Sequence, residues 1–136
     1  MENQERKLIQ STKNLKRALE RLEEALQEDL NNSLLVDGTI HRFEFTIKLY
    51  WKTLKRVLLS EGIEANTPKE TLKEAFQAGW LENEEAWLQM LKDRNLTSHT
   101  YDEETALLIV HNIKGYLPEM KATFSKINSK VNGSDE

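Results

Sequence analysis

Hydrophobic positions along this chain recur with the period of amphipathic helices. From about Arg6 to Leu30 the leucines follow spacings of four and three residues, with Thr12 in the one step that lacks a leucine. These positions are Leu8, Leu15, Leu19, Leu22 and Leu26. The polar residues Asn31-Asn-Ser33 and Asp37-Gly38 then interrupt the pattern. The sequence therefore predicts a first helix from about Arg6 to Leu30, followed by a loop.

A second helix is expected from about Thr39 to Gly62, and its apolar stripe is unusually wide. The stripe consists of Phe43, Ile47, Tyr50, Leu54, Val57 and Leu58, and it is widened by Phe45, Leu49 and Trp51. So broad an apolar arc favours the central helix of a bundle, which packs on more than one neighbour. Gly62 is a suitable C-terminal cap for this helix.

Two shorter helices are expected next. Thr67-Pro-Lys-Glu70 is a capping box with proline at the first helical position, and Gly79 closes the third helix. Asn83 caps a fourth helix, which should fade between residues 97 and 99. Its core-facing residues are Trp87 and Leu91, with Leu88 beside them. This part of the chain therefore predicts two helices joined by a short connection.

The fifth helix is expected to open at a second capping box, formed by Thr100 and Glu103. Its stripe comprises Ala106, Ile109, Ile113, Leu117, Met120, Phe124 and Ile127. Pro118 removes an internal hydrogen bond, so we expect a kink there. Residues 131–136 are typical of a frayed tail.

These elements predict an all-α fold in a single domain covering residues 1–136. The sequence contains no strand-like alternation and no internal repeat. Short connections favour antiparallel neighbours, so we expect an up-and-down bundle of about five helices. The core should contain Phe43, Ile47, Tyr50, Leu54, Trp87, Leu91, Ile109 and Ile113.

Composition narrows the cellular setting of the protein. The 136 residues include no cysteine, which excludes disulfides and thiolate metal sites, and the net charge of −4 argues against indiscriminate nucleic-acid binding. The charged N-terminus is unlike a signal peptide. The longest aliphatic run, Ala106 to Val110, is far shorter than the roughly 20 residues that span a bilayer. We therefore expect a cytoplasmic protein with no membrane partner.

One polar segment, from Asp93 to Tyr101, departs from the leucine stripes. It carries Arg94 and, five positions later, His99. Arginine matches phosphate oxygens with a planar fork, and histidine exchanges protons near neutral pH. Because the box at Thr100 implies that the preceding helix has ended, a turn can bring His99 back toward Arg94. Such a pair could cleave RNA without metal, although an ordinary turn with solvated polar groups explains the same residues.

The spacing of Arg94, His99 and Tyr101, with polar Asn95 after the arginine, resembles the Arg-x-x-x-x-His-x-Tyr signature of HEPN-domain proteins. More narrowly, the chain is similar to the branch called nucleotidyltransferase substrate-binding proteins. The other segments that carry this similarity are Arg42-Phe-Glu-Phe-Thr46, Trp51-Lys-Thr-Leu-Lys55, Pro68-Lys-Glu70, Glu74-Ala-Phe76 and Glu85-Ala-Trp-Leu88. The similarity extends from about Leu15 to Met120.

This resemblance implies a helical subunit that works with a small, separate nucleotidyltransferase, as in toxin–antitoxin pairs. In such pairs the HEPN subunit is a metal-independent endoribonuclease, and its partner silences it by adding adenylyl groups to the tyrosine. Carried onto this chain, Arg94 and His99 are catalytic and Tyr101 accepts the modification. The alternative function is a non-catalytic subunit that binds substrate or nucleotide for the nucleotidyltransferase. Neither function implies a cofactor.

Further charged residues could support such a site. Lys48, Lys52 and Lys55 lie at helical spacing on one face and could hold RNA phosphates, although a solvated lysine face explains the same spacing. Glu44 lies between two phenylalanines and could point into a polar pocket near the signature. A surface or capping role for Glu44 is equally open. Asn95 is the other possible supporting residue.

Metal and nucleotide sites are not expected in the chain alone. The acidic residues 102–104 beside His99 suit a helix N-terminus, where carboxylates are favoured, better than a metal site. No glycine loop for phosphates exists, so the chain should not bind ATP by itself. One Arg94 and one His99 supply few contacts for a flexible RNA. We therefore expect a homodimer in which both signatures line one cleft.

Overall fold

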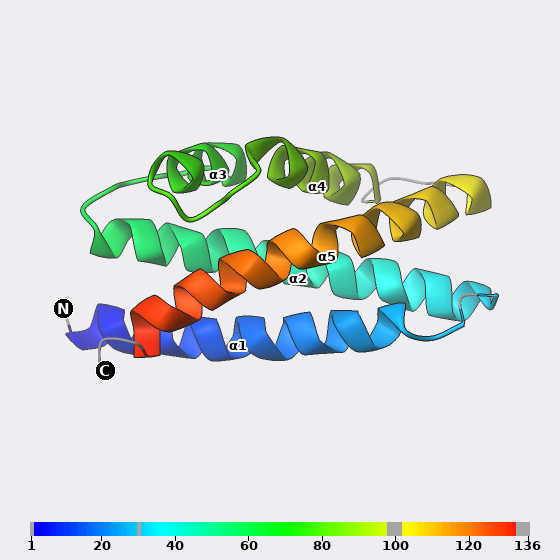
Figure 1. Ribbon diagram of the computed structural model, residues 1–136, viewed down its shortest axis with the longest axis horizontal. Coiled ribbons are helices and arrows are strands. Elements are labelled where there is room, and N and C mark those ends of the chain that lie inside the picture. Colours follow the sequence, from blue (N-terminus) through cyan, green and yellow to red (C-terminus); the bar gives the residue numbers. More distant parts are fainter. Residues whose placement is uncertain (1, 30, 98–101, 133–136) are drawn as a thin grey trace.

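The computed structural model describes residues 2–29, 31–97 and 102–132, and every regular element in these ranges is an α-helix. The helices are α1 (Glu2–Leu26), α2 (Ser33–Ser60), α3 (Pro68–Gln77), α4 (Glu84–Thr97) and α5 (Glu103–Asn132). In Figure 1 the long helices α1, α2 and α5 lie side by side, and the shorter α3 and α4 lie on the side of α2 away from α1. α1 and α2 run in opposite directions, and so do α4 and α5. The predicted up-and-down bundle is therefore confirmed.

The core of the bundle lies along α2, which contacts each of the other four described helices. The central position predicted from its wide apolar stripe is therefore correct. All the predicted core residues are buried except Leu91, which is partly buried. Phe45 differs from the prediction, because 52% of its surface is exposed and it does not extend the core.

The first two helices begin earlier than predicted, and the loop predicted to reach Gly38 is wrong. α2 starts at Ser33, where the side chain of Asn32 accepts a hydrogen bond from the backbone N–H of Leu34 at 2.7 Å. Gly38 therefore lies inside the helix, at a cost of about 1 kcal/mol relative to alanine. The burial of Val36 and Ile40 on either side of Gly38 offsets this cost.

The predicted ends of the middle helices agree with the structure. Gly62 and Gly79, with φ of 81° and 90°, follow the C-termini of α2 and α3 in the left-handed conformation that glycine allows. The Thr67 hydroxyl accepts from the Glu70 backbone N–H at 3.1 Å. The side chain of Asn83 caps α4 in the same way.

The start of α5 differs from the predicted capping box. The side chain of Asp102 accepts a hydrogen bond from the backbone N–H of Thr105 at 2.7 Å, and the helix begins at Glu103. These contacts with Thr105 hold the pKa of Asp102 below its usual value. Aspartate caps helices as well as threonine does, so the cap falls two residues beyond Thr100, which lies outside the described residues. α5 continues through Pro118, and the kink predicted there stays a prediction.

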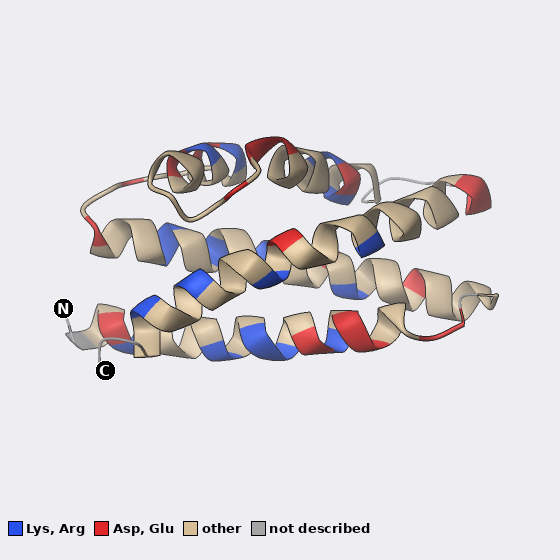
Figure 2. Ribbon diagram, in the orientation of Figure 1, with Lys and Arg blue, Asp and Glu red and all other residues tan. Residues whose placement is uncertain are grey.

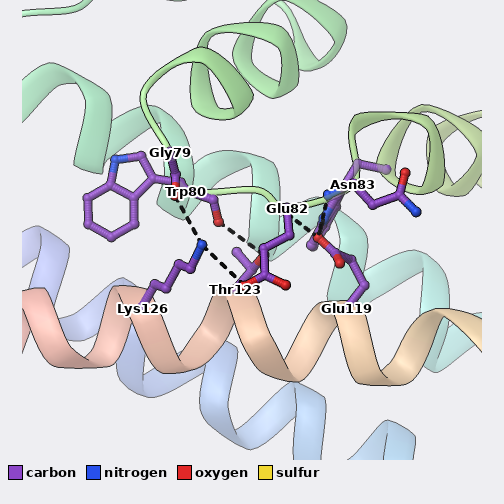
Figure 3. A network of polar contacts seen from close by, with 8 residues as sticks. Gly79, Trp80, Glu82, Asn83, Glu119, Thr123 and Lys126 are labelled. Carbon is purple, nitrogen blue, oxygen red and sulfur yellow. Dashed lines mark hydrogen bonds and ion pairs between the residues drawn. The ribbon is translucent and has the colours of Figure 1, made fainter.

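Glu119 of α5 holds the connection between α3 and α4 (Figure 3). Its carboxylate accepts hydrogen bonds from the backbone N–H groups of Glu82 and Asn83 at 3.1 and 3.2 Å. It also accepts one from Trp87 Nε1 at 2.9 Å. A single carboxylate therefore fixes the first turn of α4 and a buried core side chain to α5.

The next turns of α5 continue this bracing (Figure 3). The Thr123 hydroxyl donates to the carbonyl oxygen of Trp80 at 3.2 Å. Lys126 Nζ donates to the carbonyl oxygen of Gly79 at 3.2 Å and lies 3.5 Å from a Glu82 carboxylate oxygen. The α3–α4 connection is therefore tied to α5 at several points between Gly79 and Asn83.

Charged side chains are distributed unevenly over the bundle. Acidic residues gather toward the C-terminal end of α1, whereas α2 carries mainly Lys and Arg between residues 42 and 56 (Figure 2). Local positive surface therefore exists despite the net charge of −4. In the ranges that the structure describes, no helix is long and apolar enough to cross a membrane.

Replacing Glu119 should measurably destabilise the bundle. We expect Glu119→Ala to lower the free energy of unfolding by about 1–3 kcal/mol, because three donors lose their carboxylate acceptor. Urea denaturation followed by circular dichroism measures the change. Glu64→Ala, at an exposed position in the α2–α3 connection, is the matched control. A loss in Glu119→Ala no larger than in the control would contradict the bracing role.

Candidate functional site

Asp93, directly before Arg94, anchors the last turns of α4 to α5. Its side chain is buried, with 5% of its surface exposed. It accepts hydrogen bonds from Gln89 Nε2 at 3.1 Å, Asn112 Nδ2 at 3.3 Å and the Tyr116 hydroxyl at 2.6 Å. A buried carboxylate needs such donors to offset its desolvation. This network therefore sets the register of α4, and with it the direction of Arg94.

Tyr116 extends the network from α5 to α2. Its ring stacks on Phe43, with centroids 6.2 Å apart and an interplanar angle of 22°. Burial raises the pKa of the Tyr116 phenol well above its usual value, and the hydrogen bond and charge of Asp93 raise it further. The phenol therefore keeps its proton and remains a donor to Asp93 at neutral pH.

Thr97, the last residue of α4, ties that helix to α2. Its hydroxyl lies 2.7 Å from Glu44 Oε2 and 2.8 Å from the carbonyl oxygen of Arg94. Glu44 is partly buried. Because it contacts Thr97, it lies beside the end of the helix that carries the signature arginine. Its supporting role stays a prediction.

The signature itself is described only in part. Arg94 is partly buried, and its Nη1 donates to Oδ1 of the neighbouring Asn95 at 3.3 Å. His99 and Tyr101 lie outside the described residues. The predicted pairing of Arg94 with His99 and the role of Tyr101 therefore stay predictions.

The three lysines of the predicted RNA-binding face belong to α2. Lys48 and Lys52 are exposed and Lys55 is partly buried. Lys48 follows Glu44 by one helical turn, so the lysine face begins beside the end of α4. Among the described residues, no group of three or more His, Asp and Glu side chains is arranged to hold a metal ion. This finding does not test the expectation that the chain holds no metal, which stays a prediction.

No role in the site was predicted from the sequence for Asp93, Asn112 or Tyr116. Asp93 is flanked by charged residues and has the composition of a solvated surface. A weak signal exists in the spacing of Asn112 and Tyr116, which lie one turn apart on α5. Only the packing of α5 against α4 brings them to the carboxylate.

The fold and this polar end of α4 define a HEPN-type helical bundle. Residues 10–129 match the model of the family described as nucleotidyltransferase substrate binding protein like. The chain therefore belongs to that family, which confirms the resemblance found in the sequence.

Individual relatives agree with this assignment. The chain is 29% identical over 110 residues to a Haemophilus influenzae protein named probable ribonuclease HepT, covering 77% of this chain and 75% of the relative. A solved Thermus thermophilus protein is 31% identical, with a TM-score of 0.78 and coverage of 83% and 98%. A solved Haemophilus influenzae protein, described as a substrate binding domain of a nucleotidyltransferase, is 28% identical. Its TM-score is 0.76, with coverage of 86% and 98%.

Tyr116→Phe should be more costly than the loss of another buried phenol. We expect it to lower the free energy of unfolding by about 1.5–3 kcal/mol at pH 7, because the lost hydrogen bond goes to a carboxylate. Tyr50→Phe is the comparison, since the Tyr50 hydroxyl donates to a neutral carbonyl, that of Met120, at 2.6 Å. That variant should lose about 0.5–1.5 kcal/mol in the same urea titration. Equal losses of unfolding free energy in the two variants would contradict a charged acceptor for the Tyr116 hydroxyl.

The stability of the same variants should depend on pH differently from that of the wild type at high pH. Because the pKa values of Tyr116 and Tyr50 are raised in the folded protein, the unfolded chain loses phenolic protons first, near the ordinary pKa of about 10. Their stabilising contribution is therefore complete below pH about 10 and falls as the pH rises further. The free energy of unfolding of each phenylalanine variant should therefore fall less steeply above pH about 10 than that of the wild type.

Proposed function

We propose that this protein is the HEPN-type subunit of a pair with a separate minimal nucleotidyltransferase, and that it is a metal-independent endoribonuclease. The main support is the anchoring of α4, whose Asp93 network presents Arg94 on a fixed helix end. The family description and the name of the Haemophilus influenzae relative support the same proposal.

In this proposal the reaction uses two side chains of the signature. His99 takes the proton from a ribose 2′-hydroxyl as that oxygen attacks the neighbouring phosphorus, and then returns a proton to the departing 5′-oxygen. The Arg94 guanidinium stabilises the charge that develops on the phosphate oxygens. The phosphorus–5′-oxygen bond breaks. The products are a 2′,3′-cyclic phosphate and a free 5′-hydroxyl.

The active unit in this proposal is a homodimer with both signatures at one cleft. A single Arg94 offers one strong phosphate contact, whereas two signatures across a two-fold axis double the local positive charge. Adenylylation of Tyr101 by the partner then silences the enzyme. The added phosphate brings negative charge and bulk to the place where Arg94 must meet RNA.

Purified protein should cleave RNA in the presence of EDTA, and Arg94→Ala and His99→Ala should each lower the rate at least about 100-fold. Gel analysis of a labelled oligoribonucleotide gives the rate, and the ends of the fragments reveal the cyclic phosphate. Lys92→Ala, at an exposed position on the same helix, is the matched control and should cleave normally.

Circular dichroism must show that all three variants fold, and light scattering on the same samples gives the oligomeric state. Full activity in either signature variant, or activity that requires magnesium, would refute this mechanism. A folded wild type that cleaves no RNA would point instead to a non-catalytic subunit of a nucleotidyltransferase complex. A strict monomer would refute the shared cleft.

Incubation with the cognate nucleotidyltransferase and ATP should add adenylyl groups to Tyr101 and abolish RNA cleavage. Intact-mass spectrometry should show the added mass on the wild type and none on Tyr101→Phe, which should remain active. Tyr116→Phe is the control, since the Tyr116 hydroxyl donates to Asp93 and is not the proposed acceptor. Modification of Tyr101→Phe to the wild-type extent would exclude Tyr101 as the acceptor.

A further inference from the structure

A groove between α1 and α2 is lined by basic and aromatic side chains that the proposed reaction does not use. It has a volume of about 430 Å³. Its α1 side contains Arg17 and Arg21, and its α2 side contains His41, Arg42 and Phe45. None of the residues that line it is acidic. We call this feature the α1–α2 groove.

The groove exists because small residues bring α1 and α2 close together beneath it. Ala18 is buried, and the Thr46 hydroxyl lies 3.4 Å from its carbonyl oxygen. The longer side chains at the edges of this contact then form the two walls. Arg42 Nη1 donates to the carbonyl oxygen of Arg21 at 2.7 Å, which fixes the guanidinium of Arg42 across the groove.

The positive charge of the groove is not neutralised internally. Among the described residues, Arg17, Arg21 and Arg42 take part in no ion pair. Guanidinium groups in this state favour phosphate, which they can bind through two hydrogen bonds each. A second copy of this chain would present the same arginines and be repelled. The charge therefore favours a polyanion over self-association at this surface.

Phe45 adds a second kind of recognition. Half of this large aromatic side chain is exposed, with 52% of its surface accessible, beside the arginines of the groove. Aromatic rings beside a positive groove are typical of single-stranded nucleic-acid sites, where bases stack on the rings while cations hold the backbone. Inorganic phosphate would use the arginines but leave Phe45 without a partner.

The groove is continuous with the lysine face of α2. Lys48 lies three residues after Phe45 and four after Glu44, so it lies between the groove and the end of α4. Lys52 follows one turn further on. In the other direction, the hollow beyond Arg42 is lined by Glu24 and Glu28, where the positive surface ends. A strand that leaves the groove across Lys48 would therefore approach the end of α4 that carries Arg94.

We propose that the α1–α2 groove binds single-stranded RNA, with phosphates on Arg17 and Arg21 and one base stacked on Phe45. The groove holds the strand beside the signature and lies outside the catalytic residues. The identity of the nucleic acid as RNA rests on the proposed function, whereas the binding site rests on the geometry of the groove.

Fluorescence anisotropy with a labelled, single-stranded 2′-O-methyl oligoribonucleotide tests this proposal, because that ligand lacks the attacking hydroxyl. Arg17→Gln/Arg21→Gln should weaken binding about tenfold or more, and should reduce the slope of log affinity against log salt by about 0.7 per lost phosphate contact. Phe45→Ala should weaken binding at least about fivefold and leave the salt slope unchanged. Phe45→Leu should not restore binding, because it keeps apolar bulk without an aromatic face.

Helix α3 offers matched controls for both changes. Lys69→Gln/Lys73→Gln removes the same charge from exposed positions, and Phe76→Ala removes an aromatic ring that is 39% exposed. Both controls should bind like the wild type. A duplex of the same sequence should bind more weakly, because its bases are not free to stack.

The outcomes separate this proposal from the proposed function. Groove variants that bind like their α3 controls would overturn it, even if Arg94→Ala abolished RNA cleavage. Groove variants that keep RNA affinity but lose the nucleotidyltransferase would also overturn it, and would assign the groove to a protein partner. If the groove variants lose binding while the wild type cleaves no RNA, the groove stands and the endoribonuclease proposal fails.

Discussion

The position of α4 depends on two carboxylates, each of which accepts three hydrogen bonds. Glu119 of α5 accepts hydrogen bonds from backbone groups directly before α4. Asp93 of α4 accepts hydrogen bonds from two side chains of α5. Apolar burial is non-directional, whereas each hydrogen bond to these carboxylates requires a short donor–acceptor distance and a nearly straight donor angle. The short helix α4, held at both ends, therefore has one register, and Arg94 projects from a defined place.

The sequence predicts the helices and the core well because those depend on periodicity, and it predicts boundaries poorly where two local signals compete. Gly38 is typical of a loop that interrupts a helix, yet the burial of Ile40 beside it keeps α2 intact. Asp93 was missed for another reason: its partners Asn112 and Tyr116 follow nineteen and twenty-three residues later in the chain. Nothing in the local pattern distinguishes this buried carboxylate from a solvated one.

Helix α2 serves several purposes because its surface is divided into separate stripes. Its buried face forms the core, and Thr46 on one flank meets α1. On another flank, Glu44 meets the end of α4. Phe45 and Lys48 lie on the exposed arc between these contacts. This division explains how a chain with a net charge of −4 can carry several Lys and Arg residues on the exposed side of α2. Most acidic residues lie on other elements, on α1, in the loops and on α3, α4 and α5.

The rigidity of this frame bears directly on the proposed silencing by adenylylation. The chain enters residues 98–101 from Thr97, whose hydroxyl contacts Glu44, and leaves them at Asp102, which caps α5. The Asp93 network locks α4 to α5 on the side of Arg94. If these helices could separate easily, a negative phosphate attached beside Arg94 could be accommodated by a shift of α4. Because two carboxylates oppose such a shift, we propose that a phosphate added to Tyr101 competes with RNA for the Arg94 guanidinium. A small covalent change on a fixed frame can therefore act as a switch without any rearrangement of the fold.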